Sequence, residues 1–120
     1  MKDYKTLNVW QKSHSLTLEI YKLTQQLPQS EVYGLTSQIR RAVSSIPTNI
    51  AEGCGRGSEK DFGRFLQIAF GSASETSYLL ILISDLNYID KEIAKIMIEK
   101  VDEVMKMLYS LIKTLKPNNN

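Results

Sequence analysis

The sequence has few of the residues on which most site chemistry depends. Its 120 residues include one cysteine, Cys54, and one histidine, His14. A lone cysteine argues against a disulfide framework and fits a reducing cytoplasm. No glutamate lies three residues before the histidine, which excludes the Glu-x-x-His pairs of a di-metal bundle site, so we expect no metal and no cofactor. His14 and Cys54 fall on different segments and nothing orients them as a nucleophilic pair, so we expect no enzyme activity.

Long apolar runs are also absent. No stretch of about 18 residues is both apolar and uncharged, and the N-terminus lacks an apolar segment behind a basic one. We therefore expect neither a membrane span nor a secretory signal. Hydrophobic residues make up 42% and charged residues 23%, with a net charge of +2. This composition predicts one soluble, cytoplasmic, globular domain over residues 1–120, and its weak positive charge alone is poor support for nucleic-acid binding.

Strand patterns of useful length are missing, whereas apolar residues at helical spacing predict four helices. These cover about 9–26, 35–53, 58–86 and 90–115. Pro28 ends the first helix, and glycines at 53, 55 and 57 end the second. Pro47 falls inside the second helix, where the apolar spacing continues in phase, so we expect a kink there rather than an end. Short connections favour antiparallel neighbours, which predicts an all-α, up-down-up-down four-helix bundle.

Polar residues before three of the patterns predict where the helices begin. Asn8, Ser58 and Asp90 can each accept a hydrogen bond from the first turn that follows. Gln11 lies three residues after Asn8, and Asp61 three residues after Ser58, which are capping-box spacings. Ile93 is expected to be the first core residue of the fourth helix. A frayed tail is expected over 117–120.

The third predicted helix carries more apolar surface than one bundle seam requires. One face contains Phe62, Leu66, Ala69, Ala73, Leu80 and Ile83, and a second contains Phe65, Ile68, Leu79 and Leu82. Because large exposed apolar patches mark interfaces, this surface predicts a homo-oligomer.

Small residues at 71–74 predict a close helix crossing in the middle of the third helix. A glycine inside a helix costs about 1 kcal/mol relative to alanine, so Gly71 needs a reason to be there. The expected facing segment, 42–45, is also rich in small residues. Close packing is the simpler interpretation, and a binding role is the alternative.

Polar residues on or beside the apolar faces predict an interhelical hydrogen-bond network that fixes the register of the helices. Its expected members are Gln38, Asn49, Glu52 and Glu75. A ligand or di-metal site is the alternative, and it lacks the histidines that it would need.

Basic residues gather on the two middle helices. All four arginines fall within 25 consecutive positions, and a lysine joins them: Arg40, Arg41, Arg56, Lys60 and Arg64. If the middle helices pack antiparallel, Arg41 and Arg64 are expected at similar heights. Repeated by symmetry, such a patch favours nucleic-acid binding. The alternatives are solvated surface or intersubunit pairs with Glu31, Glu52 or Glu75. The glycine-rich run at 53–58 is interpreted first as a connection and second as a weak phosphate contact.

Several blocks of the chain resemble the signature of the 23S rRNA intervening-sequence protein family. They are Gln38–Ala42, Ser45–Pro47 and Asn49–Gly53, with further matches at 7–10, 27–35 and 65–75. The resemblance covers nearly the whole chain. It implies a four-helix bundle that forms a homopentameric barrel. Genes of this family lie within insertions in bacterial 23S rRNA genes or stand alone in bacterial genomes. A related branch is similar to the accessory proteins of diversity-generating retroelements, which are basic pentamers that bind nucleic acid and a reverse transcriptase.

Together these observations predict a non-enzymatic, homo-oligomeric protein that binds nucleic acid, RNA or DNA. Structured RNA is the favoured target, contacted through phosphates, because arginines and lysines are present and no stacking platform is evident. The alternative is a protein-interaction scaffold that binds no nucleic acid and uses its arginines for intersubunit pairs.

Overall fold

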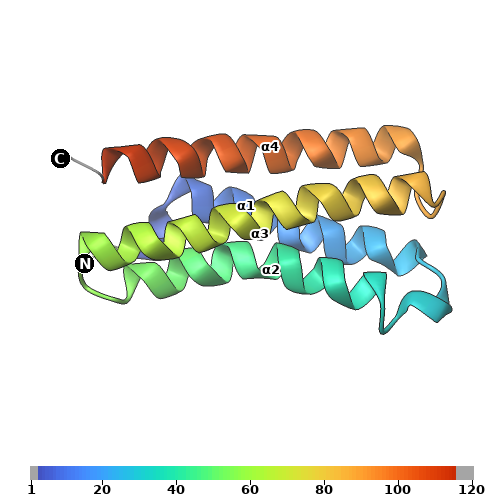
Figure 1. Ribbon diagram of the computed structural model, residues 1–120, viewed down its shortest axis with the longest axis horizontal. Helices are drawn as coiled ribbons and strands as arrows, with labels where there is room; N and C mark the ends of the chain where they lie inside the picture. The colour runs from blue at the N-terminus through green and yellow to red at the C-terminus, as the bar shows by residue number, and fades with distance from the viewer. Residues whose placement is uncertain (1–2, 116–120) are drawn as a thin grey trace.

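The computed structural model describes residues 3–115, which form an elongated all-α structure (Figure 1). Its four long helices are α1 (Asn8–Leu23), α2 (Leu35–Cys54), α3 (Glu59–Asp85) and α4 (Lys91–Thr114). Three short 3-10 helices lie before α1 or between α1 and α2, namely η1 (Tyr4–Thr6), η2 (Thr24–Gln26) and η3 (Gln29–Glu31). The described residues contain no strand, so the predicted all-α class with four packed helices is confirmed. The tail expected over 117–120 lies outside the described residues.

Side-chain pairs between the first and last helices show how the chain runs. Lys12 pairs with Glu103 at 3.1 Å, and the ammonium of Lys100 lies 2.9 Å from the carboxylate of Glu19. Later residues of α1 thus meet earlier residues of α4, and Figure 1 shows the chain turning back at each connection. The result is a bundle of 46 × 21 × 21 Å.

Two of the three expected helix caps are present. The hydroxyl of Ser58 accepts a hydrogen bond from the amide of Asp61, and the carboxylate of Asp90 accepts one from the amide of Glu92. The expectation for Asn8 is wrong, because Asn8 is already inside α1 and Leu7 takes the cap position without a side-chain bond. The side chain of Gln11 turns away from Asn8 and donates to the carbonyl of Lys5, so the preceding 3-10 turn is tied to α1.

Pro47 lies inside α2 and does not end it, as the in-phase apolar spacing predicted. Proline has no N–H to donate to the carbonyl four residues earlier, which is that of Val43. The hydroxyl of Thr17 on α1 lies 3.3 Å from that carbonyl oxygen and 2.7 Å from the carbonyl of Ser13. A neighbouring helix thus supplies a donor where α2 lacks its own.

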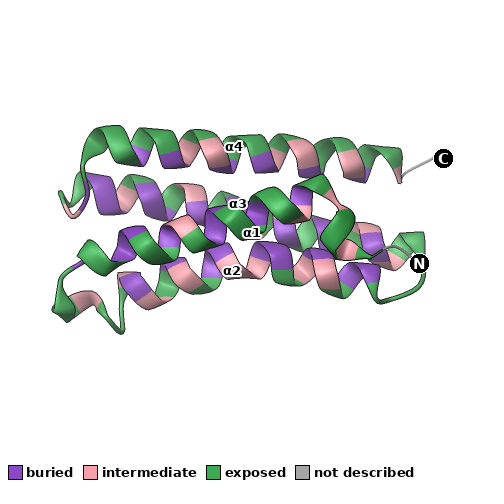
Figure 2. Cartoon of the chain, turned by 180° about the vertical axis from the view of Figure 1, so that it is seen from behind, coloured by how far each residue is buried: buried purple, intermediate pink, exposed green. Residues whose placement is uncertain are grey.

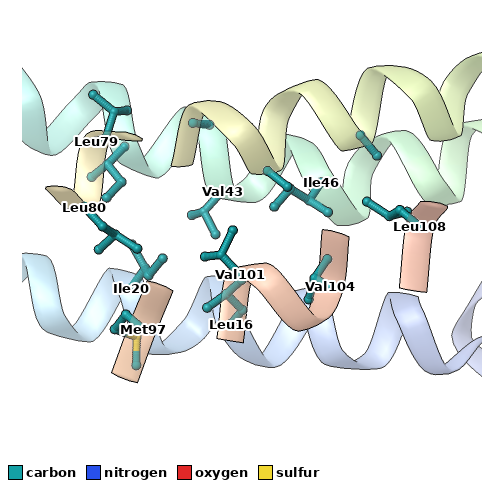
Figure 3. Packing of buried hydrophobic residues seen from close by; sticks show 14 of the residues in the cluster. Leu16, Ile20, Val43, Ile46, Leu79, Leu80, Met97, Val101, Val104 and Leu108 are labelled. Atoms are coloured by element: carbon teal, nitrogen blue, oxygen red, sulfur yellow. The ribbon is translucent and has the colours of Figure 1, made fainter. Parts of the chain in front are cut away.

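The core lies between the inner faces of the four helices, and Figure 3 shows part of its packing from close by. Its fully buried side chains include Ile20 of α1, Ile46 of α2, Leu80 of α3 and Val101 of α4. Figure 2 shows that the side of α4 that faces the other helices is buried, whereas its outer side is exposed. The first core residue of α4 is Ala94 and not Ile93, which is exposed. The buried face of α4 therefore begins one residue later than expected.

The small-residue crossing between α2 and α3 exists, but Gly71 takes no part in it. Ser45 and Ser72 share a hydrogen bond of 2.8 Å, and Ala73 is fully buried. A Cβ atom added at Gly71 would meet nothing within 4 Å, because this residue lies on the exposed side of α3. The tight glycine is Gly53, where an added Cβ would lie 2.9 Å from Cβ of Phe65.

Glu31 fastens the start of α2 to the turn between α3 and α4. One carboxylate oxygen accepts a hydrogen bond from the amide of Leu35, and the other accepts one from the hydroxyl of Tyr88. This hydrogen bond to Glu31, with burial and the negative charge of Glu31 as further causes, raises the pKa of Tyr88 above its ordinary value. Glu31, considered above as an intersubunit partner of arginine, thus caps a helix within its own chain.

The outer side of α3 is unusually apolar. By length and composition alone, α3 could cross a membrane: its most apolar window of 18 residues has a mean hydropathy of 1.3. Helices in the cores of soluble proteins pass the same test, and α3 packs between α2 and α4. Only 39% of that window is buried inside the bundle, however, so much apolar surface of α3 faces outward in a single chain.

Candidate nucleic-acid interface

The five basic residues predicted to bind nucleic acid fall into two groups. Ser45 meets Ser72, and Gly53 meets Phe65, so later residues of α3 lie opposite earlier residues of α2. Arg64 is therefore level with the end of α2, whereas Arg41 lies about 18 Å further along the bundle, at 1.5 Å per residue. The expectation that Arg41 and Arg64 share a height is wrong, because Arg64 lies in the second turn of α3, whereas Arg41 lies more than three turns before the end of α2.

The first group surrounds the turn between α2 and α3. The guanidinium carbons of Arg56 and Arg64 lie 4.9 and 5.0 Å from the centre of the Phe65 ring, so one aromatic ring holds both side chains. Lys60 is exposed in the first turn of α3. Each arginine also has an acidic partner, since Arg56 pairs with Glu52 at 3.1 Å and Arg64 with Asp61 at 3.6 Å. These pairs reduce the positive charge of this group.

The second group consists of the adjacent residues Arg40 and Arg41. Arg40 donates to the hydroxyl of Thr24 and to the carbonyl of Tyr21, and its guanidinium lies 4.8 Å from the Tyr21 ring. Arg41 is exposed and donates to the hydroxyl of Ser37. Within residues 3–115 neither arginine forms an ion pair with a carboxylate, so this group keeps its full positive charge.

The four residues of the predicted polar network do not come together in one chain. Gln38, Glu52 and Glu75 are exposed. Asn49 does take part in a contact between helices: its amide donates to the carbonyl and the hydroxyl of Ser45, whose hydroxyl is bonded to Ser72 of α3. The observed network is therefore built on Ser45 and Ser72. Their spacing alone did not distinguish these two serines from the small residues around them.

His14 and Cys54 lie in different surroundings. His14 is exposed on α1, while Cys54 is buried at the end of α2 beside the groove formed by the 57–59 segment and Phe62. Residues 3–115 contain no group of three or more His, Cys, Asp or Glu side chains that could hold a metal ion. In the 55–58 connection Gly57 has a φ of 88°, a conformation that favours glycine, and Ser58 caps α3.

An aromatic cluster on the surface of α1 was not foreseen. The rings of Trp10 and His14 are stacked, with centroids 4.9 Å apart and an angle of 10° between their planes. Tyr4 meets the edge of Trp10 at 5.1 Å. Trp10 is partly buried and packs against the core. The signal that could have revealed the cluster is the four-residue spacing of Trp10 and His14, which puts both rings on one side of the helix.

Comparisons with known proteins agree with the fold. Residues 5–110 match the family model of the 23S rRNA-intervening sequence protein. A crystal structure of a protein of unknown function from the S23 ribosomal protein family of Bacteroides thetaiotaomicron is similar, with a TM-score of 0.79 and 32% sequence identity. The similarity covers 88% of this chain and 98% of that chain. A comparison with curated proteins finds no match. Because the family model matches most of the chain, the protein belongs to the 23S rRNA-intervening sequence protein family.

Proposed function

We propose that the protein is a non-enzymatic, homo-oligomeric nucleic-acid-binding protein that contacts structured RNA through phosphate groups. The observation that carries the proposal is the pair of adjacent arginines, Arg40 and Arg41, which have no carboxylate partner within residues 3–115. A guanidinium presents several N–H donors in a planar fork, which suits phosphate oxygens. The family's association with 23S rRNA genes is consistent with an RNA target.

The side chain of Arg40 is already ordered in a position from which it can contact a phosphate. Its hydrogen bonds to Thr24 and Tyr21 and its position over the Tyr21 ring restrict the side chain. The remaining N–H groups can donate to a phosphate without a further loss of side-chain freedom. Arg41, one position later, is exposed and offers a second charge.

Arg56, Lys60 and Arg64 would add to this surface at the other end of α2. The acidic partners of the two arginines, Glu52 and Asp61, are on the surface, where ion pairs contribute little to stability. A phosphate can therefore replace a carboxylate at small cost. These three residues are expected to contribute less than Arg40 and Arg41.

Assembly of several copies of the chain would bring several copies of the basic residues Arg40 and Arg41 into one particle. The outer side of α3 exposes Ile68 at 43%, Tyr78 at 59% and Ile81 at 44%, and Gly71 lies among them with open space above it. An apolar stripe with a glycine allows the helix of a second copy to approach closely. We infer that the up-down-up-down bundle assembles through this stripe. The family resemblance points to five subunits in a bacterial cytoplasm and, through its related branch, to a reverse transcriptase as a candidate partner.

A protein-interaction scaffold is the second candidate. It is favoured by the ion pairs of Arg56 and Arg64, which use part of the positive charge within the chain. It is also favoured by exposed apolar residues outside the α3 stripe, such as Ile96 of α4.

The salt dependence of RNA binding tests the proposal. Affinity for a structured RNA hairpin should fall with a log–log slope of about 0.7 to 0.9 per neutralised phosphate. Arg41→Ala should weaken binding to all RNA sequences about equally and reduce the slope by about 1, because phosphate contacts carry no sequence information. Lys95→Ala, which removes the same charge from the exposed side of α4, serves as the control and should bind as the parent does.

Two results would contradict parts of this proposal. If folded Arg41→Ala protein keeps the affinity and salt slope of the parent, the contact at Arg41 is wrong. If the parent binds no RNA at low salt, the scaffold function replaces the RNA function.

A further inference from the structure

We propose that the face shared by α1 and α2 holds a stacking site for an unpaired nucleobase, with His14 as the ring on which the base lies. This inference rests on the proposed function, which it deepens: the phosphates would be held by Arg40 and Arg41, and a base of the same strand by His14. Single-stranded segments of structured RNA are commonly recognised in this way, by stacking of splayed bases on aromatic side chains.

The rings of Tyr4 on η1 and of Trp10 and His14 on α1 form a short ladder that ends in an exposed side chain. Tyr4 meets the edge of Trp10 at 5.1 Å, and Trp10 stacks on His14 at 4.9 Å with nearly parallel planes. Trp10 packs against the core while His14 is exposed, so the outermost ring is supported from below and open to solvent. A base that stacks on His14 would extend an arrangement already present and would require little ordering of side chains.

The groove beside this ladder offers polar groups for the edge of a base. It is open, and its opposite wall is formed by Ser44, Thr48 and Glu52 of α2. The hydroxyls of Ser44 and Thr48 donate to carbonyls of α2 and can still accept, and a carboxylate can accept from an exocyclic amino group such as N4 of cytosine. The carboxylate of Glu52 is also the partner of Arg56, at 3.1 Å, so a bound base would share it with that arginine.

Exposed side chains follow α1 from the ladder toward the arginines. Leu18, 59% exposed, follows His14 by one turn, and Tyr21, 41% exposed, carries the guanidinium of Arg40 above its ring. His14 and Tyr21 are separated by two turns of α1, about 10 Å, which one or two nucleotides can span. Exposed rings and uncompensated arginines therefore lie on one face, a combination typical of surfaces that bind single strands.

A second copy of the chain is the competing occupant of this face. An exposed stripe on a helix is commonly a subunit interface. The parallel ring stack and the two arginines without acidic partners favour a polyanion with planar groups over another copy of a chain whose net charge is also positive.

Intrinsic fluorescence can report directly on this site, because Trp10 is the only tryptophan. The probes are a single-stranded oligoadenylate, a strand of equal length without bases, and duplex RNA of equal length, each titrated into the full-length protein. We expect oligoadenylate to change the Trp10 fluorescence, and the strand without bases to bind more weakly and to leave the fluorescence unchanged.

Variants separate stacking from charge. His14→Ala should weaken binding of oligoadenylate by roughly 5- to 150-fold, which corresponds to the loss of one base–aromatic stack of about 1–3 kcal/mol. His14→Phe should restore most of it, and duplex binding should change in neither variant. Ser15→Ala, an exposed residue of α1 that lines a different groove, is the matched control and should behave as the parent.

Two outcomes would overturn the stacking site while leaving the proposed function standing. In one, His14→Ala binds oligoadenylate and duplex RNA as the parent does. In the other, His14→Ala lowers the mass of the oligomer in light scattering, which would assign this face to a contact between copies. If none of the three probes binds at low salt, the proposed function fails together with the stacking site.

Discussion

Gly53 lies in the last turn of α2, against the first turns of α3, where an added Cβ would lie 2.9 Å from Cβ of Phe65 and 3.0 Å from Cδ1 of Phe62. Glycine is required at this point by space, since two aromatic residues already fill the room that a side chain would need. The sequence interpretation placed the tight contact at Gly71, because small residues cluster around it. Clustering shows that a close crossing exists, but it does not show on which side of the helix each small residue lies. Ser72 and Ala73 face the bundle, and Gly71 does not.

Substitution of two glycines by alanine should therefore have opposite effects. Gly53→Ala should lower the free energy of unfolding by about 1–3 kcal/mol, because the methyl group overpacks the contact with Phe62 and Phe65. Gly63→Ala should raise it by about 0.4–1 kcal/mol, because Gly63 is inside α3 with nothing within 4 Å of an added Cβ, and alanine restricts the unfolded chain. Urea denaturation of both variants gives the comparison. Equal stabilities would show that Gly53 is not sterically restricted.

At the scale of helices, the sequence was a good guide wherever one local rule decided the outcome. Ser58 and Asp90 cap their helices because an oxygen at the right position meets a free amide. The same rule predicted a cap at Asn8, but Asn8 does not cap α1. The helix begins one residue earlier than expected, because η1 and the hydrogen bond from Gln11 to Lys5 precede it. The apolar faces followed from spacing alone. The aromatic ladder did not, since a pattern of apolar residues cannot separate a buried ring from one that is half exposed.

The donor supplied by Thr17 could not be predicted either, because it depends on how α1 and α2 are placed. Thr17→Val should lower the free energy of unfolding by about 1–3 kcal/mol, the cost of leaving a buried polar group without its partner. In a Pro47→Ala background the loss should be smaller, because alanine returns an N–H that can bond the carbonyl of Val43.

A double-mutant cycle by chemical denaturation measures this coupling. Thr114→Val is a suitable control, because the hydroxyl of Thr114 is exposed and bonds only the carbonyl of Leu111 in its own helix. Additive effects of Thr17→Val and Pro47→Ala would mean that Thr17 does not compensate for the proline.

At the scale of the whole molecule, the two outward surfaces have different characters. The face of α1 and α2 carries rings and arginines, whereas the outer side of α3 carries Ile68, Gly71, Tyr78 and Ile81. If α3 makes the contact between copies, each subunit keeps its basic face free, and symmetry repeats that face around the oligomer. Several weak phosphate contacts would then act together, which can raise the overall affinity far above that of one subunit.

This division of surfaces predicts how assembly responds to a change at Gly71. The parent should have a mass in light scattering that is a multiple of the 13.7 kDa of one chain, five-fold by the family resemblance. Gly71→Leu should shift the protein toward the monomer with its helix content unchanged, because the added side chain has open space within its own chain and would collide only with a neighbour. Ser110→Leu, which adds a similar side chain to the exposed side of α4, is the control and should leave the mass unchanged. A parent of 13.7 kDa at all micromolar concentrations would contradict the oligomer. If instead the oligomer persists in Gly71→Leu, the contact between copies lies on another face, and the exposed rings of α1 become the next surface to test.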